Sequence, residues 1–245
     1  MSLPVVLLNG IMMTGESWHH QTRALSDSYR VVTHDFRGQL RNLMPGPFEL
    51  RQHVEDLRAL LDDLGIDRAH LVGTSYGGEV AMLFALAHPE RVASLALIAC
   101  VSHVEPPLRE AIELWRETAL HEPEQLFDLT APYNYSPSFL TEAVMAAGRE
   151  RVRRYPGAFF PAFAALCDAF LTLDITGRLD AIVPRTLVIA AENDRLKPLH
   201  YSRTIAARIP NARLEVIPAS GHAVVIENPA AVNALLLDWL ARSSV

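Results

Sequence analysis

The stretch HLVGTSYGGEVAMLFALAH, residues 70–88, joins a short apolar run to a longer helical pattern through a glycine-rich turn. Its centre, GTSYG at residues 73–77, matches the G-x-S-x-G pattern in which a serine occupies a sharp strand-to-helix turn. Small neighbours let the backbone pass closely there, and the helix that follows directs free N–H groups toward developing negative charge. An ordinary serine N-cap in a glycine-rich turn is the alternative. The position between a strand and a helix favours Ser75 as a nucleophile.

Outward from this turn, short apolar runs alternate with helical patterns over most of the chain. The expected strands are Pro4–Leu8, Arg30–His34, His70–Gly73, Ser94–Ala99, Thr186–Ala190 and Leu214–Ile217. Most are continuously apolar, as expected of a parallel sheet whose two faces are both buried. Gly65 ends one amphipathic helical pattern, and Asn228 and Pro229 begin the last one. The alternation predicts an α/β fold, with a mostly parallel sheet flanked by helices.

The alternation breaks between residues 103 and 180. That segment shows helical patterns around Leu108–Leu120, Ser138–Tyr155 and Phe159–Leu171, and no clear strand. It also holds most of the aromatic residues: Trp115, Phe127, Tyr133, Tyr135, Phe139, Tyr155, Phe159, Phe160, Phe163 and Phe170. We therefore expect a catalytic core of residues 1–102 and 181–245, with a helical cap at residues 103–180 inserted in it. Most of these aromatics are expected to form the cap's own core, and about a quarter of them to line a substrate pocket.

The strand-to-helix turn at residues 73–77 is of the kind called a nucleophile elbow. With this turn in its context, the chain resembles the α/β-hydrolase superfamily from end to end. Within it, the chain is similar to the capped, cofactor-free branch that includes 3-oxoadipate enol-lactonases and many uncharacterised esterase-like hydrolases. The resemblance implies a sheet of about eight strands, a lid inserted after the sixth, and a nucleophile, acid, base order along the chain. It also implies no cofactor, and the sequence itself contains no metal-ligand cluster, no dinucleotide fingerprint and no P-loop.

The resemblance places the base in a loop between the last strand and the C-terminal helix, where the stretch ASGH, residues 219–222, ends on His222. It places the acid after the preceding strand, where Glu192 and Asp194 are both available. Asp194 matches the family pattern, whereas Glu192 is expected to support the loop, although either carboxylate could reach the ring. Ser75, Asp194 and His222 would then form a catalytic triad.

The same resemblance implies an oxyanion hole built from two backbone N–H groups, those of Ile11 and Tyr76. Ile11 belongs to the loop NGIMMTG, residues 9–15, which is similar to the His-Gly-x loop of the superfamily. Asn9 takes the place of the usual histidine. The loop FRGQL, residues 36–40, keeps Arg-Gly but lacks the usual Gly-His-Gly-x-Ser continuation, so the sequence does not fix a close subfamily.

Composition and charge narrow the possible partners. The 245 residues are 50% hydrophobic, and the formal net charge is −6. This charge balance predicts neither a basic surface for nucleic acid nor a polybasic segment for a membrane. The first residues are expected to form a strand rather than a signal peptide. Cys100 and Cys167 lack a CxxC spacing and are expected to be buried thiols, so the predicted compartment is the cytoplasm.

The leading function is hydrolysis of a small carboxylic ester or lactone through an acyl-enzyme. An acyltransferase, or a cofactor-free lyase, peroxidase or carbon–carbon hydrolase, could use the same triad. A non-catalytic ligand receptor is a third possibility, which a complete triad disfavours. The arginine-rich run at residues 149–154 could grip a substrate carboxylate, but a solvated helix face is the preferred interpretation. The sequence does not specify the natural substrate or the oligomeric state.

Overall fold

A single parallel sheet organises the molecule, in a computed structural model that describes residues 2–242. Its strands are β1 (Val5–Leu8), β2 (Val31–His34), β3 (Ala69–Thr74), β4 (Val92–Ile98), β5 (Thr186–Ala191) and β6 (Ala212–Ile217). They lie in the order β2-β1-β3-β4-β5-β6, and every neighbouring pair is parallel. From β1 the chain first adds β2 on one side and then adds β3 on the other side, so the strand order reverses between β1 and β3. In such sheets ligands bind outside the carboxyl ends of the strands at this switch point.

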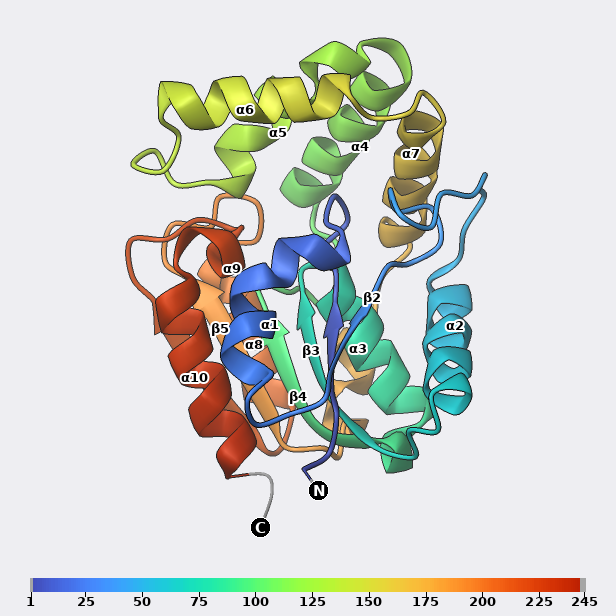
Figure 1. Cartoon of the computed structure of the whole chain (residues 1–245), viewed down its shortest axis with the longest axis vertical. Helices are drawn as coiled ribbons and strands as arrows, with labels where there is room; N and C mark the ends of the chain where they lie inside the picture. The colour runs from blue at the N-terminus through green and yellow to red at the C-terminus, as the bar shows by residue number, and fades with distance from the viewer. Residues whose placement is uncertain (1, 243–245) are drawn as a thin grey trace.

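Helices cover both faces of the sheet (Figure 1). On one face lie α1 (His19–Leu25), α9 (Val224–Glu227) and α10 (Pro229–Ala241), whose apolar side chains join one buried cluster. On the other face lie α2 (Leu50–Asp63), α3 (Tyr76–Ala87) and α8 (Leu199–Arg208), which belong to a second cluster. The predicted helix signals are present: Gly65 follows α2 with a φ of 63°, and the Asn228 side chain accepts from the N–H of Ala231.

Four further helices form a layer beyond the carboxyl ends of the strands, at the top of Figure 1. They are α4 (Pro106–His121), α5 (Leu126–Asn134), α6 (Glu142–Arg153) and α7 (Phe159–Phe170), and all lie between β4 and β5 in sequence. The sequence patterns anticipated α4, α6 and α7 but missed α5, which contains Pro132. The larger buried cluster runs continuously from the sheet into these helices, so the layer shares its hydrophobic core with the sheet.

The number of strands differs from the expectation. The α/β-hydrolase architecture is present, but the described residues contain six strands rather than about eight, and the helical layer follows the fourth strand rather than the sixth. The six are the strands that the apolar runs identified, whereas the larger number came only from the resemblance. The division into a core of residues 1–102 and 181–245 and a cap of residues 103–180 stays a prediction.

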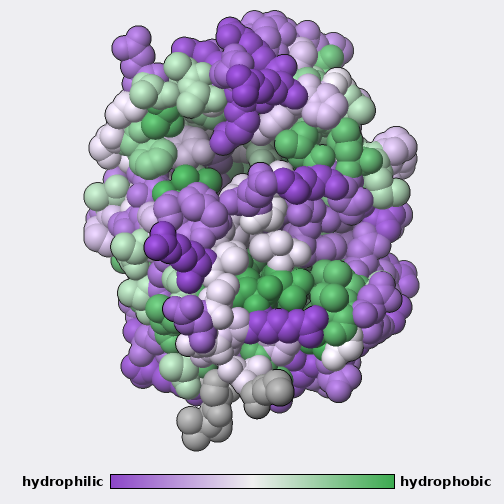
Figure 2. Space-filling view, in the orientation of Figure 1, coloured by the Kyte–Doolittle hydropathy of each residue, from purple (hydrophilic) through white to green (hydrophobic). Residues whose placement is uncertain are grey.

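The face shown in Figure 2 is mainly hydrophilic, with separate hydrophobic patches. Apolar atoms contribute a large share of any protein surface, so scattered patches of this kind need no special explanation. Among residues 2–242, none of the helices combines the length and the apolar character needed to cross a bilayer.

Candidate active site

Ser75 occupies a strained turn between β3 and α3. Its φ of 50° and ψ of −122° lie in a region that residues with a side chain rarely adopt. The turn is possible because its neighbours are glycines: a Cβ on Gly77 would lie 2.2 Å from the carbonyl oxygen of Leu8, and one on Gly73 would lie 2.4 Å from the oxygen of Gly77. Such strain costs about 1–3 kcal/mol and persists only where the surroundings enforce it.

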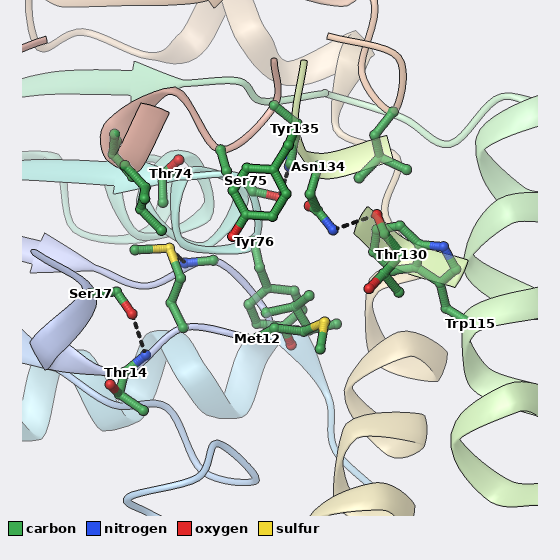
Figure 3. A pocket seen from close by; sticks show the side chains of 18 of the residues that line it. Met12, Thr14, Ser17, Thr74, Ser75, Tyr76, Trp115, Thr130, Asn134 and Tyr135 are labelled. Atoms are coloured by element: carbon green, nitrogen blue, oxygen red, sulfur yellow. Dashed lines mark hydrogen bonds between the residues drawn. The ribbon is translucent and has the colours of Figure 1, made fainter. Parts of the chain in front are cut away.

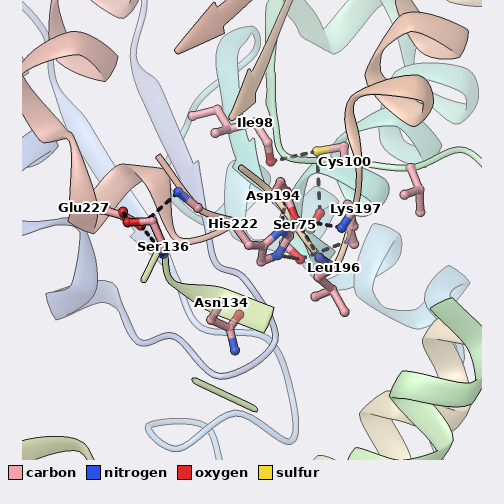
Figure 4. Close-up of polar contacts among 12 residues, drawn as sticks. Ser75, Ile98, Cys100, Asn134, Ser136, Asp194, Leu196, Lys197, His222 and Glu227 are labelled. Atoms are coloured by element: carbon pink, nitrogen blue, oxygen red, sulfur yellow. Dashed lines mark hydrogen bonds and ion pairs between the residues drawn. The ribbon is translucent and has the colours of Figure 1, made fainter. Parts of the chain in front are cut away.

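A continuous chain of polar contacts links this serine to residues in the loops after β6 and β5 (Figure 4). Oγ of Ser75 lies 2.9 Å from Nε2 of His222, and Nδ1 of His222 lies 2.7 Å from Oδ2 of Asp194. The structure therefore brings together the three side chains named from the sequence. His222 and Asp194 are each only 5% exposed, so water screens their interaction weakly.

The two candidate carboxylates have different surroundings. Oδ1 of Asp194 accepts the N–H groups of Leu196, at 3.0 Å, and Lys197, at 2.7 Å, which leaves Oδ2 for the imidazole. Glu192 is exposed, and its carboxylate accepts the N–H of Ala219, at 2.9 Å, in the loop that leads to His222. Asp194 thus contacts the ring, and Glu192 supports the loop.

The N–H groups of Ile11 and Tyr76 both belong to residues that line the cavity beside Ser75. Gln39 donates from Nε2 to the carbonyl oxygen of Gly10 at 2.8 Å, and the oxygen of Ser75 accepts the N–H of Gly78 at 2.8 Å. Because C=O and N–H point in opposite directions across a trans peptide, fixing these two carbonyls also fixes the directions of the Ile11 and Tyr76 N–H groups.

Asn9 is part of the support for this loop. Its side chain accepts from Nε1 of Trp18 at 2.9 Å and donates to Asp35 at 3.2 Å and to Gln39 at 3.1 Å. It is completely buried, and these three hydrogen bonds join it to side chains of other segments. The residue that departs from the superfamily pattern therefore has a structural role in holding β1, β2 and the loop after β2 together.

Two charged residues that sequence reasoning missed lie next to Ser75. Nζ of Lys197 is 3.1 Å from Oγ of Ser75 and 2.9 Å from Oε1 of Glu79. Both signals were available in the sequence. Glu79 is the one charged residue of the helical run at residues 76–87, and Lys197 is the single lysine of a chain that otherwise uses arginine.

A third missed residue, Glu227, connects the His222 loop to the helical layer. Its carboxylate accepts the N–H of Gly221 at 3.0 Å and the N–H of Ser136 at 3.1 Å, and it also contacts the Ser136 hydroxyl (Figure 4). One residue beyond the histidine, the N–H of Ala223 donates to the oxygen of Asn134 at 2.7 Å. The His222 loop and the end of α5 are therefore held together.

Ser75 opens onto a cavity of about 370 Å³ between the sheet and the helical layer. Figure 3 shows Met12, Tyr76, Trp115 and Tyr135 around it. Five of the ten aromatics predicted for the cap line this cavity, namely Trp115, Phe127, Tyr135, Tyr155 and Phe170, so the expected quarter was too low. So many of these aromatic residues line the cavity because the strand ends cover only one side of it, and the helical layer closes the other side.

The arginine-rich segment of α6 mostly forms surface ion pairs. Arg149 pairs with Asp128 at 2.7 Å, and Arg154 pairs with Glu150 at 2.8 Å. Arg151 is the member of this segment that lines the cavity, with its guanidinium 5.9 Å from the centre of the Phe127 ring. The segment is thus largely the solvated face that the sequence favoured, with one cation at the pocket.

Other titratable groups are buried and make no hydrogen bond with the hydroxyl of Ser75 among the described residues. Burial lowers the pKa of His34, His53 and His70 to about 4 in each case. Burial also raises the pKa of both Cys100 and Cys167, and neither thiol is in a disulfide, which agrees with the prediction of buried free thiols. Over residues 2–242, no group of three or more His, Cys, Asp or Glu side chains is arranged to hold a metal ion.

Comparison with known proteins agrees with this architecture. A family model described as the alpha/beta hydrolase fold matches residues 4–229. A protein of Caulobacter vibrioides (strain NA1000 / CB15N), named "Putative carbamate hydrolase RutD", is 31% identical over 250 residues, covering 96% of this chain and 89% of that protein.

Two solved structures are also similar. MGS-M2, an alpha/beta hydrolase enzyme from a Medee basin deep-sea metagenome library, has a TM-score of 0.93 and 29% identity, covering 98% of this chain and 90% of its own. The enol-lactonase from Burkholderia xenovorans LB400 has a TM-score of 0.90 and 25% identity, covering 98% of this chain and 92% of its own.

The fold and these relatives define the class as a hydrolase. The chain belongs to the α/β-hydrolase family, as the match over residues 4–229 shows.

Proposed function

We propose that this hydrolase cleaves a small carboxylic ester or lactone through an acyl-enzyme formed on Ser75. The observation that carries the proposal is the contact chain from Oγ of Ser75 to Nε2 of His222 at 2.9 Å and from Nδ1 to Asp194 at 2.7 Å. A hydroxyl, an imidazole and a carboxylate in this sequence of contacts are the groups that nucleophilic acyl transfer requires.

In the acylation step, Oγ of Ser75 attacks the carbonyl carbon while its proton moves to Nε2 of His222. The carbonyl electrons move onto oxygen, where the N–H groups of Ile11 and Tyr76 would stabilise the negative charge. Collapse of this intermediate expels the alcohol oxygen, which takes the proton from His222. Asp194 keeps Nδ1–H oriented and stabilises the imidazolium while it exists.

In the second step, water attacks the acyl carbon and gives a proton to the same Nε2. Collapse then breaks the bond to Oγ of Ser75, which takes that proton back and is restored as the free hydroxyl. A lactone gives a single hydroxy-acid product, because its alcohol and acid remain joined. An acceptor alcohol in place of water would make the same site an acyltransferase.

Helices α4 to α7 are proposed to act as a cap, with residues 103–180 as the inserted unit. This segment contributes Trp115, Phe127, Tyr135, Tyr155 and Phe170 to the cavity wall, whereas the reacting groups lie in loops at the strand ends. The mainly apolar wall suits an apolar acyl or alcohol group, and the cavity volume of about 370 Å³ is at the lower end of the usual range for small-molecule sites.

Carbamate hydrolysis is the second candidate, favoured by the name of the Caulobacter vibrioides relative at 31% identity. The two candidates differ in the group that the acyl carbon carries. A panel of p-nitrophenyl esters, small lactones and carbamates separates them by their values of kcat/KM.

A fluorophosphonate probe tests the shared mechanism. We expect mass spectrometry to find the probe on Ser75, and Ser75→Ala to lower ester turnover by roughly 10⁴–10⁶-fold with little change in folding. Esterase activity of the Ser75→Ala variant equal to that of the unmodified chain would show that the nucleophile is another group.

A further inference from the structure

Lys197 is the one lysine in the sequence, and it is almost completely buried, with 3% of its surface exposed. Its Nζ lies 3.1 Å from Oγ of Ser75, 2.9 Å from Oε1 of Glu79 and 4.7 Å from the centre of the Phe170 ring. An ammonium has three N–H donors, which the Ser75 oxygen, the Glu79 oxygen and the face of the Phe170 ring can receive. Lys197 therefore contacts the attacking oxygen itself.

The counter-ion of Lys197 comes from the elbow helix. Glu79 has no exposed surface, and its Oε1 also accepts the N–H of Val101 at 2.9 Å. Burial raises the pKa of Glu79, and the neighbouring Lys197 opposes that rise. Removing two charges from water costs more than a surface ion pair returns, so stability alone is a weak reason for this pair.

We propose that Lys197 is a further catalytic residue, whose ammonium stabilises the negative charge that develops on Oγ of Ser75 as the proton moves to His222. The inference rests on the proposed function, because it assigns a role within the same acyl-transfer reaction. Glu79 acts through Lys197 and is a positioning residue.

The geometry around Oγ allows all these contacts at once. The hydroxyl has one proton, which faces Nε2 of His222, and two lone pairs. One lone pair accepts the N–H of Lys197, and the other remains for the carbonyl carbon. In both steps the charge on Oγ is greatest when the proton is on His222, so the ammonium interacts more strongly with that transition state than with the neutral hydroxyl.

The same short turn sets the positions of the acid and the lysine. Oδ1 of Asp194 accepts the backbone N–H of Lys197 at 2.7 Å, while Oδ2 contacts His222. The site therefore holds two positive and two negative partners, the imidazolium with Asp194 and the ammonium with Glu79. An ammonium without Glu79 would instead oppose protonation of the histidine.

Two variants separate this role from a purely structural one. Lys197→Met removes the ammonium but leaves Glu79 buried without its partner, which can itself disturb folding. Lys197→Met/Glu79→Gln removes both charges while retaining similar volumes and an amide oxygen for the N–H of Val101. Arg91→Met/Asp62→Asn is the matched control, since it removes an ion pair of 2.8 Å that makes no contact with Ser75.

The measured quantity is the second-order rate constant for fluorophosphonate labelling of Ser75, together with kcat and KM for an ester. We expect the Lys197→Met/Glu79→Gln variant to fold and to be labelled roughly 10- to 100-fold more slowly, the effect of losing one charge-assisted hydrogen bond, with KM little changed. The control pair should be labelled at the normal rate. Restoration of normal labelling in the doubly substituted variant would overturn the proposal, because it would mean that the lysine serves only to neutralise Glu79.

A second measurement keeps the test independent of variant folding. Because the chain has one lysine, labelling with ε-¹³C-lysine gives one side-chain NMR signal. Reaction of Ser75 with the probe should shift this signal, and an unchanged signal would refute the contact. Failure of the proposed function looks different, since the unmodified chain would then not be labelled at Ser75 at all.

Discussion

Substitution of Asp194 by asparagine replaces one carboxylate oxygen with an NH₂ group, and the structure determines how the new amide is oriented. Oδ1 of Asp194 accepts two backbone N–H groups, at 3.0 and 2.7 Å. In Asp194→Asn the amide oxygen must take this position, because an NH₂ group there would face two donors. The NH₂ group is therefore directed at Nδ1 of His222.

The consequence is a change of tautomer. Nδ1 must then accept a hydrogen bond, so the ring proton moves to Nε2, and Nε2 can no longer take the proton of Ser75. We expect kcat to fall by about 10⁴-fold, the size known for this exchange in serine-protease triads. That factor corresponds to about 5 kcal/mol of transition-state stabilisation.

The assay is ester turnover across a pH range, with Glu192→Gln as the matched control. Glutamine at position 192 can still accept the N–H of Ala219 through its amide oxygen, so turnover should stay within about threefold. If Glu192→Gln lost more activity than Asp194→Asn, or if Asp194→Asn kept a tenth of normal turnover, the assignment of the acid would be wrong.

The remaining predictions concern the oxyanion loop, acid stability and specificity. Gln39→Met should lower kcat by about tenfold or more with a smaller change in KM, because the Gly10 carbonyl loses its donor; unchanged kinetics would remove Gln39 from the loop's support. The folded pKa of His53 is about 4, so the unfolded chain binds a proton near pH 6.5 that the folded chain resists, and the free energy of unfolding falls as pH drops through this window. In urea titrations, the free energy of unfolding of His53→Leu should fall between pH 7 and pH 4 by about 3 kcal/mol less than that of the unmodified chain. An equal fall in both proteins would contradict a neutral buried ring. Tyr155→Leu, at the cavity wall, should change ester preference but not fluorophosphonate labelling, while Phe163→Leu, in the core, should lower Tm without changing preference; the reverse pattern would refute this division.

The sequence was most informative where local patterns and chemistry coincide. All six strands were identified from short, mainly apolar runs. The inner strands β1, β3, β4 and β5 are almost entirely buried, as expected of a covered parallel sheet, whereas the edge strands β2 and β6 are only partly buried and include polar residues. Ser75 could be singled out because its turn needs glycines at fixed positions. Asp194 and His222 were chosen from the resemblance. In the structure His222 contacts the Ser75 hydroxyl, and Asp194 contacts His222.

The residues that were missed depend on contacts between distant segments. Gln39 contacts a loop 29 positions earlier, and Lys197 contacts a helix residue 118 positions earlier. No local periodicity reports such pairs. Helix α5 was missed for a local reason: Pro132 normally interrupts a helical pattern, and here it lies inside the helix.

The bridge that Glu227 makes between Ser136 and Gly221 affects how specificity experiments on this corner should be interpreted. Gly221 precedes the histidine, and a Cβ on it would lie 2.5 Å from the backbone nitrogen of Ser136, so the two segments touch along their main chains. A substrate or a substitution that displaces residues 134–136 therefore also displaces the imidazole. Changes in selectivity obtained there combine pocket shape with the alignment of the proposed proton acceptor, and changes at Phe170 of α7 combine pocket shape with the surroundings of the Lys197 ammonium.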